Sequence, residues 1–112
     1  MKMLNITKFE DPSHGWYKVP VALLERLNIL SKISGFSYVS HDGTTAYLEE
    51  DCDADVFFQA YLDSQHAPRP LTYEIFKQYV NVTTKHTNDE SPIRDLLSYP
   101  EHLFQPQPMQ EA

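Results

Sequence analysis

Cysteine and long apolar runs are scarce in this chain, and each shortage excludes a class of protein. Cys52 is the only cysteine among the 112 residues, so no disulfide can form within the chain, and the sequence fits a reducing compartment. No apolar run approaches the roughly 20 residues that a membrane-spanning helix needs, and residues 1–7 lack the apolar core of a signal peptide. We therefore expect a cytoplasmic protein that does not enter a membrane.

Positive charge is scarce as well. The chain carries 9 Lys and Arg against 16 Asp and Glu, which gives a formal net charge of −7. This balance disfavours binding to nucleic-acid phosphates and to anionic membranes, so we expect no direct binding to either. The 41% hydrophobic and 12% aromatic content is enough for one core. We predict a single domain over residues 1–104 and a flexible tail, rich in Pro and Gln, over residues 105–112.

The centre of the chain predicts a β-hairpin. Asp42-Gly43 is typical of a two-residue type I′ turn, because Asp tolerates positive φ and Gly adopts it freely. Folding about this dipeptide places Tyr38 opposite Tyr47, and a cross-strand aromatic pair contributes roughly 0.2–1 kcal/mol. The hairpin then leads through an acidic corner into an amphipathic helix over residues 53–63.

The remaining segments complete an α+β domain. Residues 1–13 look irregular, and residues 71–80 fit a helix or a strand almost equally well. We predict a small, mostly antiparallel sheet of three or four strands, with the hairpin at its centre and three or four short helices packed against it. The predicted strands are 15–19, 36–41, 44–50 and 80–86, and the predicted helices are 20–27, 53–63 and a short one that begins at Ser91-Pro92.

A series of short motifs runs through the first half of the chain: His14-Gly-Trp16, Val19-Pro20, Ile33-Ser, Phe36-Ser-Tyr38 and Tyr47-Leu-Glu-Glu-Asp-Cys-Asp53. This series resembles a group of small proteins from tailed-phage genomes, over roughly residues 9–62 and part of 80–95. Residues 63–79 look like an insertion relative to that group, and Asn28 stands where glycine is more usual. The resemblance implies a phage or prophage setting inside a bacterial cell, and it implies no particular activity.

The most distinctive feature of the sequence is the run from Glu49 to Asp55, in which five of seven side chains are carboxylates. Such acids can cap the amides at the start of a helix, attract a basic partner, or bind Mg²⁺ or Ca²⁺ through oxygen. The run lacks the glycine and the later bidentate Glu of an EF-hand loop. We therefore favour the helix cap first, a partner-binding patch second and a metal site last, and we expect no metal and no cofactor.

Nothing in the sequence has the spacing typical of a catalytic site. The five histidines show neither HxxxH nor HxH spacing, and a single cysteine cannot anchor a typical zinc site. Cys52 lies among acids, and neighbouring negative charge disfavours the thiolate. Arg94 follows a turn and fits an ion pair with Asp89, with Glu90 or with a carboxylate of the acidic corner. We therefore predict that the chain has no catalytic residues and is not an enzyme.

A protein that acts by binding another protein fits these features best, because tyrosines beside charge favour interfaces. We expect a partner with a basic surface, such as a nucleic-acid-binding or defence factor of a host cell, which the protein inhibits or modulates. Two alternatives stay open. One is a small metal-dependent enzyme that acts on nucleotides or phosphodiesters through carboxylates 49–55, with His14 or Arg94. The other is a structural or assembly accessory protein, which could be a homo-oligomer. The predicted contact residues are Tyr38, Tyr47, Glu49, Glu50, Asp51 and Asp53.

Overall fold

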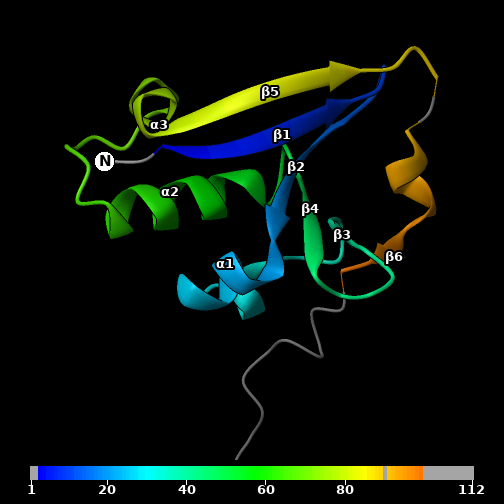
Figure 1. Ribbon diagram of the computed structural model, residues 1–112, viewed down its shortest axis with the longest axis horizontal. Coiled ribbons are helices and arrows are strands. Elements are labelled where there is room, and N and C mark those ends of the chain that lie inside the picture. The colour runs from blue at the N-terminus through cyan, green and yellow to red at the C-terminus, as the bar shows by residue number, and fades with distance from the viewer. Residues whose placement is uncertain (1–2, 90, 100–112) are drawn as a thin grey trace, which may run out of the picture.

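One sheet of six strands forms the frame of the molecule (Figure 1). The computed structural model describes residues 3–89 and 91–99. The strands follow the order β5-β1-β2-β4-β3-β6, in which β1 and β5 are parallel and the other neighbouring pairs are antiparallel. The strands are β1 (Leu4–Glu10), β2 (Gly15–Pro20), β3 (Tyr38–Val39), β4 (Thr45–Glu49), β5 (Val80–His86) and β6 (Leu97–Ser98).

Three α-helices and two short 3₁₀ helices accompany the sheet in the described part of the chain. Figure 1 shows α1 and α2 below β1, α3 beside the start of β5, and β6 next to β3 at the opposite edge of the sheet. None of these helices is long and apolar enough to cross a membrane. The helices are α1 (Val21–Arg26), η1 (Leu30–Lys32), α2 (Ala54–Ser64), α3 (Tyr73–Tyr79) and η2 (Pro92–Asp95).

The chain forms an α+β fold, but the prediction of a small, mostly antiparallel sheet of three or four strands is wrong. The sheet has six strands and is mixed, and the described residues contain only three α-helices. The sequence hides β1 because its side chains alternate weakly, and this strand forms through parallel pairing with the distant β5, from Leu4–Val80 to Glu10–His86. The other missed strand, β6, is only two residues long. The predicted tail over residues 105–112 lies outside the described residues.

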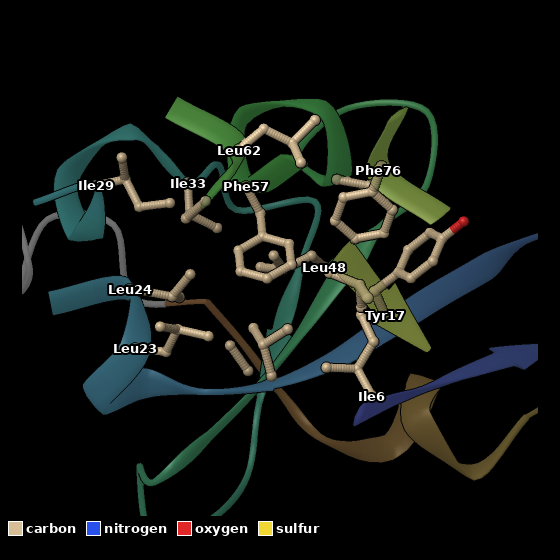
Figure 2. Packing of buried hydrophobic residues seen from close by; sticks show 14 of the residues in the cluster. Ile6, Tyr17, Leu23, Leu24, Ile29, Ile33, Leu48, Phe57, Leu62 and Phe76 are labelled. Carbon is tan, nitrogen blue, oxygen red and sulfur yellow. The ribbon is translucent and has the colours of Figure 1, made fainter. Parts of the chain in front are cut away.

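The hydrophobic core fills the space between the three helices and one face of the sheet, which we call the inner face. Phe57 of α2 is fully buried, and Figure 2 shows its ring pointing towards Leu48 of β4. The ring of Phe58 stacks on that of Phe76 of α3, with 4.0 Å between their centroids. Burial of large aromatic side chains is the main source of stability in a chain of this length. The buried residues that the sheet contributes to this core are Ile6, Tyr17, Val19, Ala46, Leu48 and Val80.

The hairpin has the predicted register and a different turn. Tyr38 lies opposite Tyr47, as the sequence predicts. The type I′ turn does not form: Gly43 has a φ of +75°, whereas Asp42 is not among the described residues with positive φ. The Gly43 amide instead donates to the Ser40 carbonyl over 2.9 Å, and the Asp42 carboxylate accepts hydrogen bonds from Ser40 and Thr44. The side chain of Asp42 therefore holds the turn.

Most of the predicted helices and strands outside the N-terminus are present. Residues 71–80, where helix and strand are almost equally plausible from sequence, contain α3, because the Thr72 hydroxyl accepts a hydrogen bond from the Ile75 amide at its start. Asn28 adopts a φ of +60° just after α1, as expected of a residue that ends a helix. The Ser91 hydroxyl accepts a hydrogen bond from the Ile93 amide, but the helix that follows is a single 3₁₀ turn.

Candidate functional site

Strand alternation divides the acidic run between the two faces of the sheet. Side chains of successive strand residues point to opposite faces. Leu48 belongs to the inner core, so Glu50 follows it on the inner face. There Glu50 pairs with Lys8 over 2.9 Å, and a Cβ at Gly15 would lie only 2.8 Å from the Glu50 carboxylate. The run therefore does not act as one acidic patch, and Glu49 and Asp51 belong to the opposite face, which we call the outer face.

Asp53 occupies the position before α2 but does not cap its amides. The helix start has no side-chain capping bond, and the Asp53 carboxylate is buried. It accepts hydrogen bonds from the Ser34 amide and hydroxyl, over 3.0 and 2.8 Å, and from the Ser37 hydroxyl. The Ser37 hydroxyl in turn accepts from the Glu49 amide over 3.0 Å. The capping interpretation of Asp53 is therefore wrong, and this carboxylate fastens the loop before β3 to the end of β4.

The outer face carries a cluster of aromatic rings across β1, β2, β4 and β3. Phe9 lies opposite Trp16 in the register, and Tyr47 lies opposite Tyr38. Ring centroids are 6.2 Å apart for Phe9 and Tyr47, and 6.2 Å apart for Trp16 and Tyr38. Trp16 is buried, whereas Phe9, Tyr38 and Tyr47 are half-buried. We call the three half-buried rings the aromatic row.

The segment around η2 covers the buried end of this cluster. The Arg94 guanidinium lies 5.3 Å from the centroid of the Trp16 ring, a cation–π contact. Arg94 also donates to the Asp11 carboxylate through Nε over 2.8 Å, and Asp11 is buried. The same carboxylate accepts from the amide of Ser91 over 3.0 Å. We call Asp11 and Arg94 the clasp, because this pair holds the segment that follows β5 against the end of β1.

The clasp changes the acidity of its carboxylate. The Arg94 hydrogen bond holds the pKa of Asp11 well below its usual range, with further help from the amides of Ser91, His14 and Ser13. Asp11 therefore keeps its negative charge at acidic pH. Arg94 forms an ion pair with Asp11, a carboxylate other than those that the sequence suggests for it.

Two carboxylates of the acidic run meet a histidine at the end of the outer face. Donor atoms of His14, Glu49 and Asp51 all lie within 4.8 Å of one another. Glu49 is buried, and its carboxylate accepts a hydrogen bond from the Asp51 amide, whereas Asp51 is exposed. Alternation would suffice to place Glu49 and Asp51 together. The sequence does not show that His14 joins them, because that contact depends on the pairing of β2 with β4.

The six predicted contact residues therefore separate. Tyr38, Tyr47 and Asp51 belong to the outer face and are half-buried or exposed, Glu50 is half-buried in an ion pair, and Glu49 and Asp53 are buried. Sequence reasoning missed Phe9, which extends the aromatic row. It also missed Phe36, whose exposed fraction is 71%. Phe36 begins the predicted strand over residues 36–41, so the sequence offers no sign of its exposure.

The thiol beside this end of the sheet is a weak nucleophile, and the groove that an enzyme would need lies elsewhere. Burial and the carboxylates of Glu49, Asp53 and Asp51 raise the pKa of the Cys52 thiol, so it is a weak nucleophile. A groove of about 680 Å³ lies between the α1–η1 region and α2, where Val56 and Leu71 are among the lining residues. Its lining does not include His14, Glu49 or Asp51.

Comparison with protein-family models, curated proteins and solved structures finds no match to this chain.

Proposed function

We propose that the protein acts by binding another protein through its outer face. The observation that supports this proposal is the aromatic row of Phe9, Tyr47 and Tyr38, whose rings stay partly exposed beside one another. Trp16 next to them is sealed by Arg94. Half-buried aromatic rings with their edges in water are the side chains that most often supply binding energy at interfaces.

Charge beside the aromatic row favours a basic partner. Burial and the Asp42 carboxylate raise the pKa of Tyr47, so negative charge acts on this ring from the turn. Asp51 is exposed beyond the other end of β4. The net charge of −7 adds to the field of these two acids. Complementary charge accelerates encounter, and buried aromatic contacts then slow dissociation. We infer that the partner is a host factor with a basic surface, such as a nucleic-acid-binding protein, which this chain inhibits or modulates.

In this proposal the acidic residues have separate roles. Asp51 would contact the partner directly, together with Tyr38 and Tyr47. Glu49 and Asp53 would support the surface from below, because their carboxylates already accept hydrogen bonds from Asp51, Ser34 and Ser37. Charge reversal at a buried residue such as Asp53 would therefore unfold the corner instead of testing the contact.

Capture from bacterial lysate, read by quantitative mass spectrometry, tests the proposal. We expect the tagged protein to enrich a basic protein, and we expect Tyr47→Ala and Asp51→Lys each to reduce that enrichment at least tenfold, the loss typical of a residue that contributes 1.4 kcal/mol or more. Tyr73→Ala and Asp55→Lys are matched controls, because both residues are exposed on the helical side of the sheet. Equal losses in the control variants, or no loss at Tyr47 and Asp51, would contradict the proposal.

A further inference from the structure

We propose that His14, Glu49 and Asp51 form a binding site for a divalent transition-metal ion of the Zn²⁺ type. This site is separate from the aromatic row and does not depend on the proposed partner. It consists of one imidazole and two carboxylates at the end of β2 and β4, and all three can reach a common point.

The pairing of β2 with β4 brings these ligands together. Trp16 lies opposite Glu49, and the Glu50 amide donates to the Gly15 carbonyl over 2.9 Å, which extends the pairing by one residue. The next position places His14 beside Asp51. His14 precedes β2, and Asp51 lies in the turn that follows β4, where the donor atoms of both side chains approach that of Glu49. The three side chains thus come together from adjacent chain segments.

The distances suit an ion after a small adjustment. The three donor atoms lie within 4.8 Å of one another, whereas two ligands of a tetrahedral ion with bonds of about 2.1 Å are about 3.4 Å apart. Asp51 is exposed, so its carboxylate can rotate towards the others. The buried Glu49 is held by the hydrogen bond from the Asp51 amide, so one ligand is already positioned.

The donor set selects the class of ion. Imidazole nitrogen suits Zn²⁺ and its first-row neighbours, whereas Mg²⁺ and Ca²⁺ take oxygen ligands. Two carboxylates balance the charge of a divalent ion. Three protein ligands leave one position of a tetrahedral ion for water.

A second observation points to the same place. The indole Nε1 of Trp16 is the one buried side-chain nitrogen or oxygen, among the residues that the structure describes, without a hydrogen-bond partner. Trp16 lies in β2, two residues after His14, and directly opposite Glu49. A buried N–H without an acceptor destabilises the folded state. The oxygen of a metal-bound water is an acceptor of the kind that this N–H lacks.

The tryptophan also provides the test, because it is the only one in the chain and neighbours two of the ligands. The full chain, first freed of metal with a chelator, is titrated with Zn²⁺ by calorimetry. A parallel titration with Co²⁺ follows the quenching of Trp16 fluorescence and the visible absorption of the bound ion. We expect saturable binding at a ratio of one ion per chain, together with quenching by Co²⁺.

Matched variants distinguish Zn²⁺ binding at this site from binding to other histidines and acids of the chain. We expect His14→Ala and Asp51→Asn each to weaken Zn²⁺ binding at least tenfold, since loss of a ligand costs more than the 10–100-fold typical of groups behind the ligands. His41→Ala and Asp55→Asn alter an exposed histidine and an exposed acid elsewhere, and should bind as the parent does. Circular dichroism confirms that each variant is folded.

The outcomes that would overturn the proposal differ from those that bear on the proposed function. Absence of saturable binding, or binding that His14→Ala and Asp51→Asn leave unchanged in folded protein, would exclude the metal site. Asp51 belongs to both proposals, so Tyr47→Ala, measured without added metal, is the variant that tests partner capture alone, and neither result would affect it. Loss of partner capture in Tyr47→Ala would likewise leave Zn²⁺ binding intact.

Discussion

The two faces of the sheet carry aromatic residues in different surroundings. On the inner face, rings pack against other rings and aliphatic side chains from the helices, as Phe57 does against Phe76 and Leu48 (Figure 2). On the outer face, Trp16 is covered by a charged residue, Arg94, which is itself held by a buried carboxylate. The inner face therefore stabilises the fold by excluding water. The outer face combines rings, charges and a histidine, the groups that recognition and ligand binding use.

This difference indicates which face of so small a domain is available for binding. A face devoted to apolar packing cannot change without loss of stability, because each large core residue contributes several kcal/mol. The outer face is covered only in part, and it keeps the aromatic row and Asp51 accessible. Three predictions test this division, from the largest expected effect to the smallest.

Truncation of Phe57, the central ring of the inner face, should cause the largest loss of stability. Phe57 is fully buried and its ring neighbours those of Phe58, Tyr61 and Phe76. We expect Phe57→Ala to lower the free energy of unfolding by about 3–5 kcal/mol, since it removes the ring and leaves a cavity. Urea denaturation followed by circular dichroism measures the change.

A matched truncation on the outer face provides the comparison. Tyr47 is half-buried, so we expect Tyr47→Ala to lower the free energy of unfolding clearly less than Phe57→Ala does. If Phe57→Ala does not fold, Phe57→Leu should still cost about 1.5 kcal/mol and serves instead. Equal losses of unfolding free energy in the two alanine variants, Phe57→Ala and Tyr47→Ala, would show that the outer face is a second core and not an open surface.

The clasp should make stability depend on acid pH. Because its partners hold the pKa of Asp11 below the ordinary value, the stabilisation is complete above the carboxyl range near pH 4 and is lost as pH falls towards the folded pKa. Arg94→Gln removes the main cause of the shift. We expect it to lower the free energy of unfolding by about 1–3 kcal/mol at pH 7 and by less at pH 2–3. Denaturation series between pH 7 and pH 2 measure both values.

Arg26→Gln is the control for this experiment, because it removes an exposed cation on α1. Asp42, whose pKa is lowered to about 2 by hydrogen bonds from Ser40 and Thr44, contributes the same acid dependence to all three proteins. A difference between parent and Arg94→Gln that stays constant from pH 7 to pH 2 would show that Arg94 acts through packing on Trp16 and not through Asp11.

The parts of the fold that the sequence predicts are those with local causes. The register of Tyr38 and Tyr47, the helix over residues 53–63 and the left-handed Asn28 all follow from residues within a few positions of one another. The missed parts have distant causes. β1 lies between its neighbour β2 and the distant β5 and pairs with both, and no local pattern marks it.

The candidate site shows the same limit. Hairpin geometry is enough to predict that Tyr38 and Tyr47 lie opposite each other. The sequence-based prediction is wrong for Asp53, which precedes α2 and therefore looks like its N-cap. The Asp53 carboxylate instead accepts hydrogen bonds from Ser34 and Ser37, which are distant in sequence. Polar groups buried far apart in sequence compete with local caps, and the outcome depends on tertiary packing.

A change of charge on the outer face should have the smallest effect on stability. Lys18 is exposed on this face and lies opposite Tyr47 in the register, so its positive charge opposes a basic partner. We expect Lys18→Glu to change the free energy of unfolding by less than about 0.5 kcal/mol, as exposed substitutions do. We expect it to speed association with the captured partner a few-fold at low salt and to have no effect near 1 M salt. Lys32→Glu changes the net charge by the same amount on η1, on the helical side. Stopped-flow association rates for the two variants distinguish the effect of charge on the outer face from the effect of net charge. Equal acceleration in both variants would mean that the partner responds to the net charge of the chain and not to its outer face.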